Sequence, residues 1–294
     1  MESKERFERA RTFIYENARL IDRKRFAYLF EGGKAEDVWS ALGSYQNKDG
    51  GIGHAFEPDI RCPQSQPVPT EMALHVMDET GRFDPHLMSG ILSYLKSITL
   101  PDGGFPFAFR SLMEYPHAPW WKTEDDGAPS INPTGNILGL LLKNGYLAEL
   151  SEEEWFSKSM KFMWKAMLES ELNGYHDGIQ WIHFLQFAPE TEHTTELKGK
   201  LDEWLASPGV IERNPHAEGY VHKVLDWITD EGSYAIKFVA PEELNAHLDE
   251  LVLQQQEDGG WPISFPAVSR LGELEWRGAV TVERLKTLKA FGKM

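Results

Sequence analysis

Three stretches of the sequence align without gaps: Asp49-Gly-Gly-Ile-Gly-His-Ala-Phe-Glu57, Asp102-Gly-Gly-Phe-Pro-Phe-Ala-Phe-Arg110 and Asp258-Gly-Gly-Trp-Pro-Ile-Ser-Phe-Pro266. Each contains Asp-Gly-Gly, a large apolar residue, Gly or Pro, a variable position, a small residue and Phe. The copies are separated by one and by three steps of a period of roughly 52 residues, which is typical of a helical-repeat protein. The chain is therefore expected to consist of repeated units.

The chemistry of Asp-Gly-Gly predicts the structure of one unit. Glycine adopts positive φ angles readily and aspartate bonds nearby backbone amides, so the motif ends a helix and turns the chain. Each copy follows an apolar helical stretch, so the unit is a helix, a turn and a second helix. An amphipathic hairpin cannot bury its apolar face alone. The 294 residues hold about six hairpins, which predicts an all-α fold, a single α/α toroid domain over 1–294 with an inner and an outer ring of helices.

Apolar residues at helical spacing support this prediction, and no alternating strand pattern persists. Asn132-Pro133 indicates a helix start, with Asn132 as the N-cap and proline at the first helical position. The expected helices lie near 5–30, 36–46, 70–80, 85–97, 133–144, 155–167, 179–188, 194–206, 216–229, 241–252 and 279–291.

Composition limits the partners of the chain. Its formal net charge of −16 disfavours binding to nucleic acid and to anionic membranes. No apolar run is long enough for a membrane span. Cys62 is the only cysteine, so no internal disulfide and no cysteine-based zinc cluster can form. These features predict a cytoplasmic protein. They are compatible with a small-molecule substrate and leave the oligomeric state open.

Two segments resemble a known repeat. Gln46-Asn-Lys-Asp49-Gly-Gly and Gln255-Gln-Glu-Asp258-Gly-Gly-Trp261 are similar to the QW repeat, Gln-x-x-Asp-Gly-x-Trp, of terpenoid cyclases and protein-prenyltransferase β subunits. The first copy has Ile52 in place of tryptophan, and the Asp102 copy has Thr99 in place of glutamine. The resemblance implies an α/α toroid. It implies little about chemistry, because these repeats brace the wall of the toroid.

The functional motifs of those families are mostly absent from the sequence. It contains no Asp-x-Asp-Asp, and the nearest match to Asp-Asp-x-x-Asp is Glu124-Asp125-Asp126-Gly127, which lacks the last acid. No zinc-ligand spacing and no nucleotide-binding loop occurs. The cofactor is therefore left unknown, and magnesium is expected only if the substrate carries a diphosphate.

The first candidate site follows the first repeat. This copy continues into Glu57, Asp59 and Arg61, preceded by His54, whereas the other two copies continue without such a cluster. A proline-rich connection then leads to Glu71. Paired carboxylates beside an arginine can supply one acid and one base, so Glu57, Asp59 and Glu71 are candidate catalytic residues, and His54 and Arg61 candidate substrate-binding residues. An ion-pair network that pins a long loop is an equally compatible interpretation.

Two further segments contain candidate substrate-binding residues. The loop from Tyr115 to Gly127 combines Trp120, Trp121, Asp125 and Asp126, which suit stacking and hydrogen bonding to a ligand, or a tryptophan-anchored surface loop. Trp276 and Arg277 precede the last helix and suit a carboxylate or phosphate, or an arginine packed on a ring. A weaker set, without metal-ligand spacing, comprises His176, Asp177, Trp181 and His183.

Three functions remain open at this level. The resemblance suggests a terpenoid-cyclase-like or prenyltransferase-like enzyme whose aromatic cavity stabilises carbocations. A carbohydrate-active lyase or hydrolase would use two carboxylates and stacking tryptophans. The third is a non-catalytic toroid that binds a ligand or partner.

Overall fold

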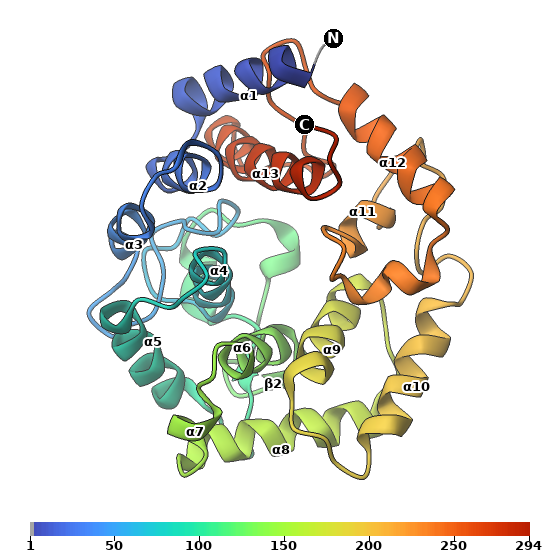
Figure 1. Ribbon diagram of the computed structural model, residues 1–294. Helices are drawn as coiled ribbons and strands as arrows, with labels where there is room; N and C mark the ends of the chain where they lie inside the picture. The colour runs from blue at the N-terminus through green and yellow to red at the C-terminus, as the bar shows by residue number, and fades with distance from the viewer. Residues whose placement is uncertain (1–2) are drawn as a thin grey trace. The chain divides into compact units, whose positions relative to one another are not determined.

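The computed structural model describes residues 3–294 and confirms an all-α fold, with thirteen α-helices in the described chain (Figure 1). The chain divides into two compact units. One comprises Met1–Lys34 with Glu203–Met294 and the other Ala35–Asp202. Closure of about six hairpins into a single toroid stays a prediction. None of the described helices is long and apolar enough to cross a membrane.

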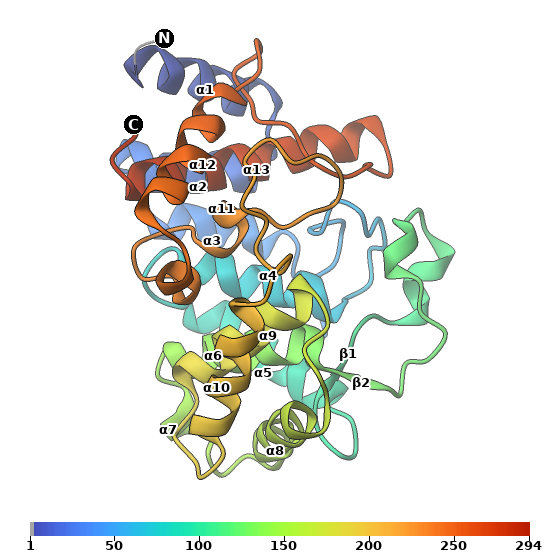
Figure 2. The same ribbon diagram turned by 90° about the vertical axis from the view of Figure 1, so that its right-hand side faces the viewer.

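The unit Ala35–Asp202 contains most of the candidate residues. Its elements are α3 (Ala35–Gly43), α4 (Pro67–Asp78), α5 (Pro85–Ile98), β1 (Phe105–Pro106), η1 (Arg110–Glu114), η2 (Pro119–Trp121), β2 (Pro129–Ser130), α6 (Ile131–Lys143), α7 (Leu147–Leu150), α8 (Glu154–Glu169), α9 (Tyr175–Phe187) and most of α10 (Thr194–Leu205). Helices α4, α6 and α9 lie side by side, with α5 and α8 packed outside them (Figure 1). The strands β1 and β2 form a short antiparallel pair, and the chain between them extends beyond the helices (Figure 2).

The other unit combines the two ends of the described chain. It contains α1 (Ser3–Asn17), α2 (Leu20–Glu31), α11 (Val224–Trp227), η3 (Tyr234–Phe238), α12 (Pro241–Leu253) and α13 (Arg270–Ala290). Helix α13 packs against α1, α2 and α12. The expected helix over 216–229 is wrong for most of its length, because Gly219 has a φ of +87° and only Val224–Trp227 is helical.

The three Asp-Gly-Gly turns dock in the same way, each on a neighbouring helix. In each, the first glycine has a positive φ, and a Cβ atom there would lie 2.0–2.2 Å from a backbone carbonyl oxygen of a neighbouring helix. The glycine and carbonyl pairs are Gly50 with Gly90 of α5, Gly103 with Lys158 of α8, and Gly259 with Arg9 of α1. The second glycine faces an aromatic ring four residues further along the same helix, at Tyr94, Phe162 and Phe13. Glycine is therefore required for the turn to dock on the helix.

A threonine then fixes the turn to the helix that follows it. The backbone N–H of the apolar residue after Asp-Gly-Gly donates to a threonine hydroxyl at 3.0–3.1 Å in every copy. The pairs are Ile52 with Thr70 of α4, Phe105 with Thr134 of α6, and Trp261 with Thr281 of α13. These bonds set equivalent positions on α4, α6 and α13.

The glutamines of the first and third copies have matching roles. The amide of Gln46 donates to Gly50 O and to Leu87 O in α5, and that of Gln255 donates to Gly259 O and to Arg6 O in α1. Each glutamine therefore joins its own turn to the neighbouring helix. Thr99, in the second copy, instead donates to the carbonyl of Leu95 within its own helix.

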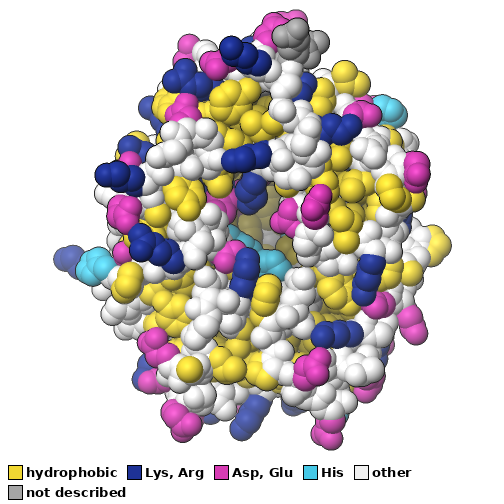
Figure 3. Space-filling view, viewed as in Figure 1, with side chains coloured by type: hydrophobic (Ala, Val, Ile, Leu, Met, Phe, Trp, Pro, Cys, Tyr) yellow, Lys and Arg dark blue, Asp and Glu magenta, His cyan; other side chains and the backbone are white. Residues whose placement is uncertain are grey.

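Acidic and basic side chains are interspersed on the face of the molecule shown in Figure 3. Several exposed pairs join a helix to a neighbouring connection, among them Arg82–Glu36 of α3 and Lys96 of α5 with Glu153. These exposed pairs contribute little individually.

Candidate functional site

Glu71 lies one residue after Thr70, the threonine that fixes the first turn to α4. The equivalent positions after Thr134 and Thr281 hold Gly135 and Val282. The repeated turn therefore does not require a carboxylate at this position. Glu71 is nevertheless buried, at 7% exposure, and a carboxylate is rarely buried without partners. Its presence points to a role specific to this helix.

Two side chains contact the carboxylate of Glu71. Asn136 Nδ2 on α6 donates to Glu71 Oε1 at 2.5 Å, and His75 Nε2, one turn further along α4, lies 3.4 Å from the same oxygen. His75 is partly exposed, whereas Asn136 is only 2% exposed. The four-residue spacing places Glu71 and His75 on one face of the helix. Together they form a carboxylate–imidazole pair supported from a neighbouring helix.

Helix α9 adds a third side chain to this cluster, because helices α6 and α9 pack very closely. Cβ atoms at Gly135 and Gly139 would lie 2.7 Å from the backbone oxygens of Gln180 and His183. The ring of His183 consequently lies 5.3 Å from that of His75, centroid to centroid. Helices α4, α6 and α9 thus each contribute a polar side chain to one region.

Burial shifts the pKa of three groups on α9. It lowers the pKa of His183 to about 3, with the nearby His75 and Lys143 contributing in the same direction. It also lowers the pKa of His176 and raises that of Asp177, although each partly offsets the shift of the other. Glu71 acts on His176 through its charge and opposes the lowering. Shifted pKa values of this kind cluster at functional sites.

The segment with the other two candidate carboxylates is buried. Glu57 is 2% and Asp59 0% exposed. The backbone oxygen of Asp59 accepts from Ala118 N, and the Arg61 guanidinium donates to Pro58 O at 3.3 Å. The exposed His54 has a φ of +56° and its ring Nε2 lies 2.9 Å from Asn47 Oδ1. The structure thus places Glu57 and Asp59 in an ordered, buried connection that precedes α4.

The tryptophan-rich loop is anchored by its own side chains. Trp121 is buried and stacks on Phe107 at 5.1 Å between centroids, whereas Trp120 is 43% exposed. Asp126 Oδ1 accepts from the backbone N–H of Arg110, and Asp125 Oδ1 accepts from that of Gly127, both at 2.7 Å. The two acids therefore brace the loop, and Trp120 presents its ring to solvent.

Arg277 and Trp276 lie in the other unit, inside α13 and not before it as expected, because this helix already begins at Arg270. The Arg277 guanidinium donates to both carboxylate oxygens of Asp258, at 2.8 and 2.7 Å, and lies 4.6 Å from the ring centre of Phe13. The hydrogen bond from Arg277 is the largest cause that lowers the pKa of Asp258. Trp276 packs edge-on against Phe265. In the structure Arg277 thus braces the third Asp-Gly-Gly turn.

We expect Arg277→Met to lower the free energy of unfolding by about 2 kcal/mol, because the bidentate bond to Asp258 and the stacking on Phe13 are lost together. Asp258 is half exposed, which keeps the effect below that of a fully buried pair. Urea denaturation measures it. Arg270→Met, an exposed change on the same helix, should alter stability by less than about 0.5 kcal/mol. Equal effects of the two changes would contradict the bracing role.

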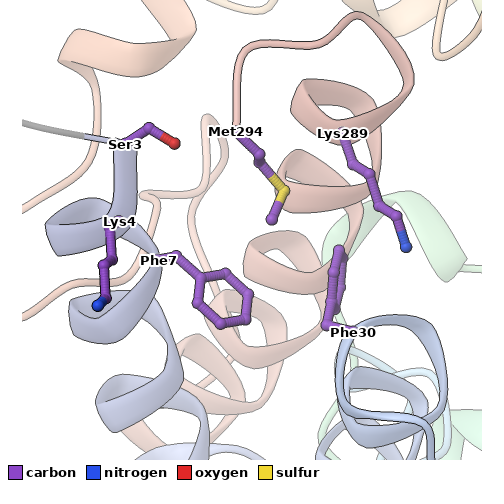
Figure 4. A pocket seen from close by; sticks show the side chains of 6 residues that line it. All are labelled: Ser3, Lys4, Phe7, Phe30, Lys289 and Met294. Atoms are coloured by element: carbon purple, nitrogen blue, oxygen red, sulfur yellow. The ribbon is translucent and has the colours of Figure 1, made fainter.

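The described residues contain no group of three or more His, Cys, Asp or Glu side chains placed to hold a metal ion. A surface pocket of about 310 Å³ lies at the ends of α1, α2 and α13 (Figure 4), lined by Ser3, Lys4, Phe7, Phe30, Lys289 and Met294. A second, of about 420 Å³, lies beside α8. Neither pocket includes a candidate residue.

Sequence reasoning identified Glu71 but missed its partners His75 and Asn136. The four-residue spacing of Glu71 and His75 on a predicted helix was the available signal for one of them. Asn136 had no such signal, because it meets Glu71 only through the packing of α6 on α4. No protein-family model and no curated protein sequence matches this chain.

Proposed function

We propose that the chain is an acid–base enzyme, a hydrolase or lyase that acts on a polar small molecule, with Glu71 and His75 as the reacting pair. The observation that carries this proposal is the buried Glu71 carboxylate, held by Asn136 and placed 3.4 Å from His75. A cytoplasmic location belongs to the same proposal.

The chemistry of the pair follows from its geometry. A carboxylate beside an imidazole orients the ring and stabilises its protonated form, so the imidazole can take a proton from a substrate or from water. His75 is the more exposed member of the pair and therefore the one placed to reach a substrate. Asn136 fixes the Glu71 carboxylate, which keeps the ring in one orientation. The neutral His183 beside His75 adds no competing charge.

The polarity of the helix faces favours a polar substrate over a prenyl chain. Glutamate, asparagine, histidine and glutamine side chains from α4, α6 and α9 meet here, whereas carbocation chemistry needs a lining of aromatic π faces. A terpenoid-cyclase-like or prenyltransferase-like activity on an apolar substrate is the alternative that the experiment below distinguishes.

The test is an activity screen of the wild-type protein and Glu71→Gln against oligosaccharides, glycosides and esters, with farnesyl diphosphate and magnesium as the apolar alternative. We expect turnover of at least one polar substrate and a loss of about 100-fold or more in kcat/KM for Glu71→Gln. The substitution keeps an oxygen that accepts from Asn136, so the fold is retained while the charge is removed.

Glu149→Gln, an exposed change in the same unit, provides the matched control and should keep full activity. Turnover of farnesyl diphosphate alone, unaffected by Glu71→Gln, would overturn the proposal. So would turnover of a polar substrate that Glu71→Gln leaves unchanged.

A further inference from the structure

The amide of Asn136 has a fixed orientation. Its nitrogen donates to Glu71 Oε1, and the reverse orientation would place two acceptor oxygens against each other. The carbonyl oxygen, Asn136 Oδ1, is buried and has no hydrogen-bond partner. The side chain is 2% exposed. Asn136 therefore carries an acceptor that nothing in the described chain satisfies.

The backbone of Asn136 is fixed as well. Asn132 has an extended conformation, with φ of −91° and ψ of 119°, so the regular helix starts at Pro133 and Asn136 lies in its first turn. Gln180 of α9 holds this turn, since its Oε1 accepts from Asn136 N at 2.6 Å, and its Nε2 donates to Asn132 Oδ1 at 3.2 Å. The free acceptor is therefore held rigidly.

Such an atom is costly unless a ligand uses it. A buried acceptor without a donor destabilises a fold, because its hydration is lost and no bond replaces it. The repeat does not require it, because the equivalent positions on α4 and α13 hold Met72 and Glu283. His183 Nδ1, on the adjoining helix, is likewise buried without a partner. Two unsatisfied polar atoms thus flank the Glu71–His75 pair.

We infer that Asn136 Oδ1 accepts a hydrogen bond from a substrate hydroxyl, and that the substrate is a sugar whose neighbouring hydroxyl donates to the Glu71 carboxylate. The inference rests on the proposed function, because both acceptors belong to the same site. Two adjacent acceptors match two adjacent donors, as vicinal hydroxyls provide. A cationic ligand fits less well, because Lys143 already places positive charge near His183.

Saturation-transfer NMR with D-glucose, D-xylose and D-glucuronate, and with putrescine as a cationic probe, tests this inference. We expect at least one sugar to bind the wild-type protein and to bind Asn136→Leu about tenfold more weakly or worse. Asn245→Leu, an exposed asparagine on α12, should bind as the wild type does. If Asn136→Leu does not fold, the side-chain NH2 resonances of Asn136 in labelled wild-type protein should shift when the sugar is added.

Binding of no sugar, equal binding to wild type and Asn136→Leu, unshifted Asn136 resonances or binding of putrescine alone would each overturn the inference. These failures are distinct from failure of the proposed function. A polar substrate whose turnover depends on Glu71 but whose KM is unchanged in Asn136→Leu would support the acid–base pair and reject the sugar-binding role of Asn136. Sugar binding that depends on Asn136, without turnover in any assay, would support the sugar-binding role of Asn136 and reject the acid–base pair.

Discussion

Gly50→Ala should lower the free energy of unfolding by about 3 kcal/mol or more. The new Cβ atom would lie 2.0 Å from Gly90 O and 2.4 Å from Gly90 C. Both are backbone atoms of α5, so no side-chain rotation relieves the clash. The residue also has a φ of +89°, which disfavours alanine. The turn must therefore withdraw from α5, and the bonds of Gln46 to Gly50 and Leu87 weaken with it.

Urea denaturation measures the loss, and Gly81→Ala is its control. Gly81 also has a positive φ, +74°, but a Cβ atom there meets nothing within 4 Å. Its substitution should cost only about 1 kcal/mol, from backbone strain alone. Gly103→Ala and Gly259→Ala should resemble Gly50→Ala, since both would place the Cβ atom 2.2 Å from a helix carbonyl. A loss in Gly50→Ala no larger than in Gly81→Ala would reject the docking explanation.

These three glycines show how far local sequence predicts this fold. Asp-Gly-Gly predicts a turn because aspartate and glycine determine the backbone locally. The second requirement, that the turn touches a particular carbonyl on α5, α8 or α1, depends on residues distant in sequence. It could be anticipated only from the recurrence of the motif. The all-α prediction is confirmed because it rests on the local part.

The segment near 216–229 shows the opposite case. Val221, Val224, Leu225 and Trp227 favour a helix by spacing, but only Val224–Trp227 adopts one. Gly219 interrupts the segment, and Lys223 Nζ donates to the carbonyl of Pro215, which holds the preceding chain as a loop. Tertiary contacts here override the helical pattern.

The candidate site likewise contains residues that the sequence suggested correctly and residues whose partners only the packing determines. Glu71 was suggested by the unusual connection that precedes it, a comparison within the sequence. Arg277 was suggested as a ligand-binding residue from its neighbour Trp276, yet in the structure its guanidinium is occupied by Asp258. Sequence shows which residue types are present, but the partner of a long charged side chain depends on packing.

Among the histidines, we expect His183 to contribute most to the pH dependence of the free energy of unfolding. Its pKa is about 3 in the folded protein, because burial disfavours the charged ring, and near 6.5 when unfolded. Between these values the unfolded chain binds a proton that the folded protein does not. Stability is therefore lost as the pH falls below about 6.5, by up to about 1.4 kcal/mol per pH unit, until the pH approaches 3.

His183→Gln removes this titration and isolates it from His176 and His247, whose pKa values are lowered in the same direction. The stability of wild type relative to His183→Gln should decrease by about 2 kcal/mol between pH 6.5 and pH 5, as measured by urea denaturation at each pH. His86→Gln, an exposed change on α5, should leave the pH profile of the wild type intact. A constant difference between wild type and His183→Gln over this range would show that His183 is not kept neutral. The packing of α9 on α4 and α6 would then be looser than the close contacts at Gly135 and Gly139 require.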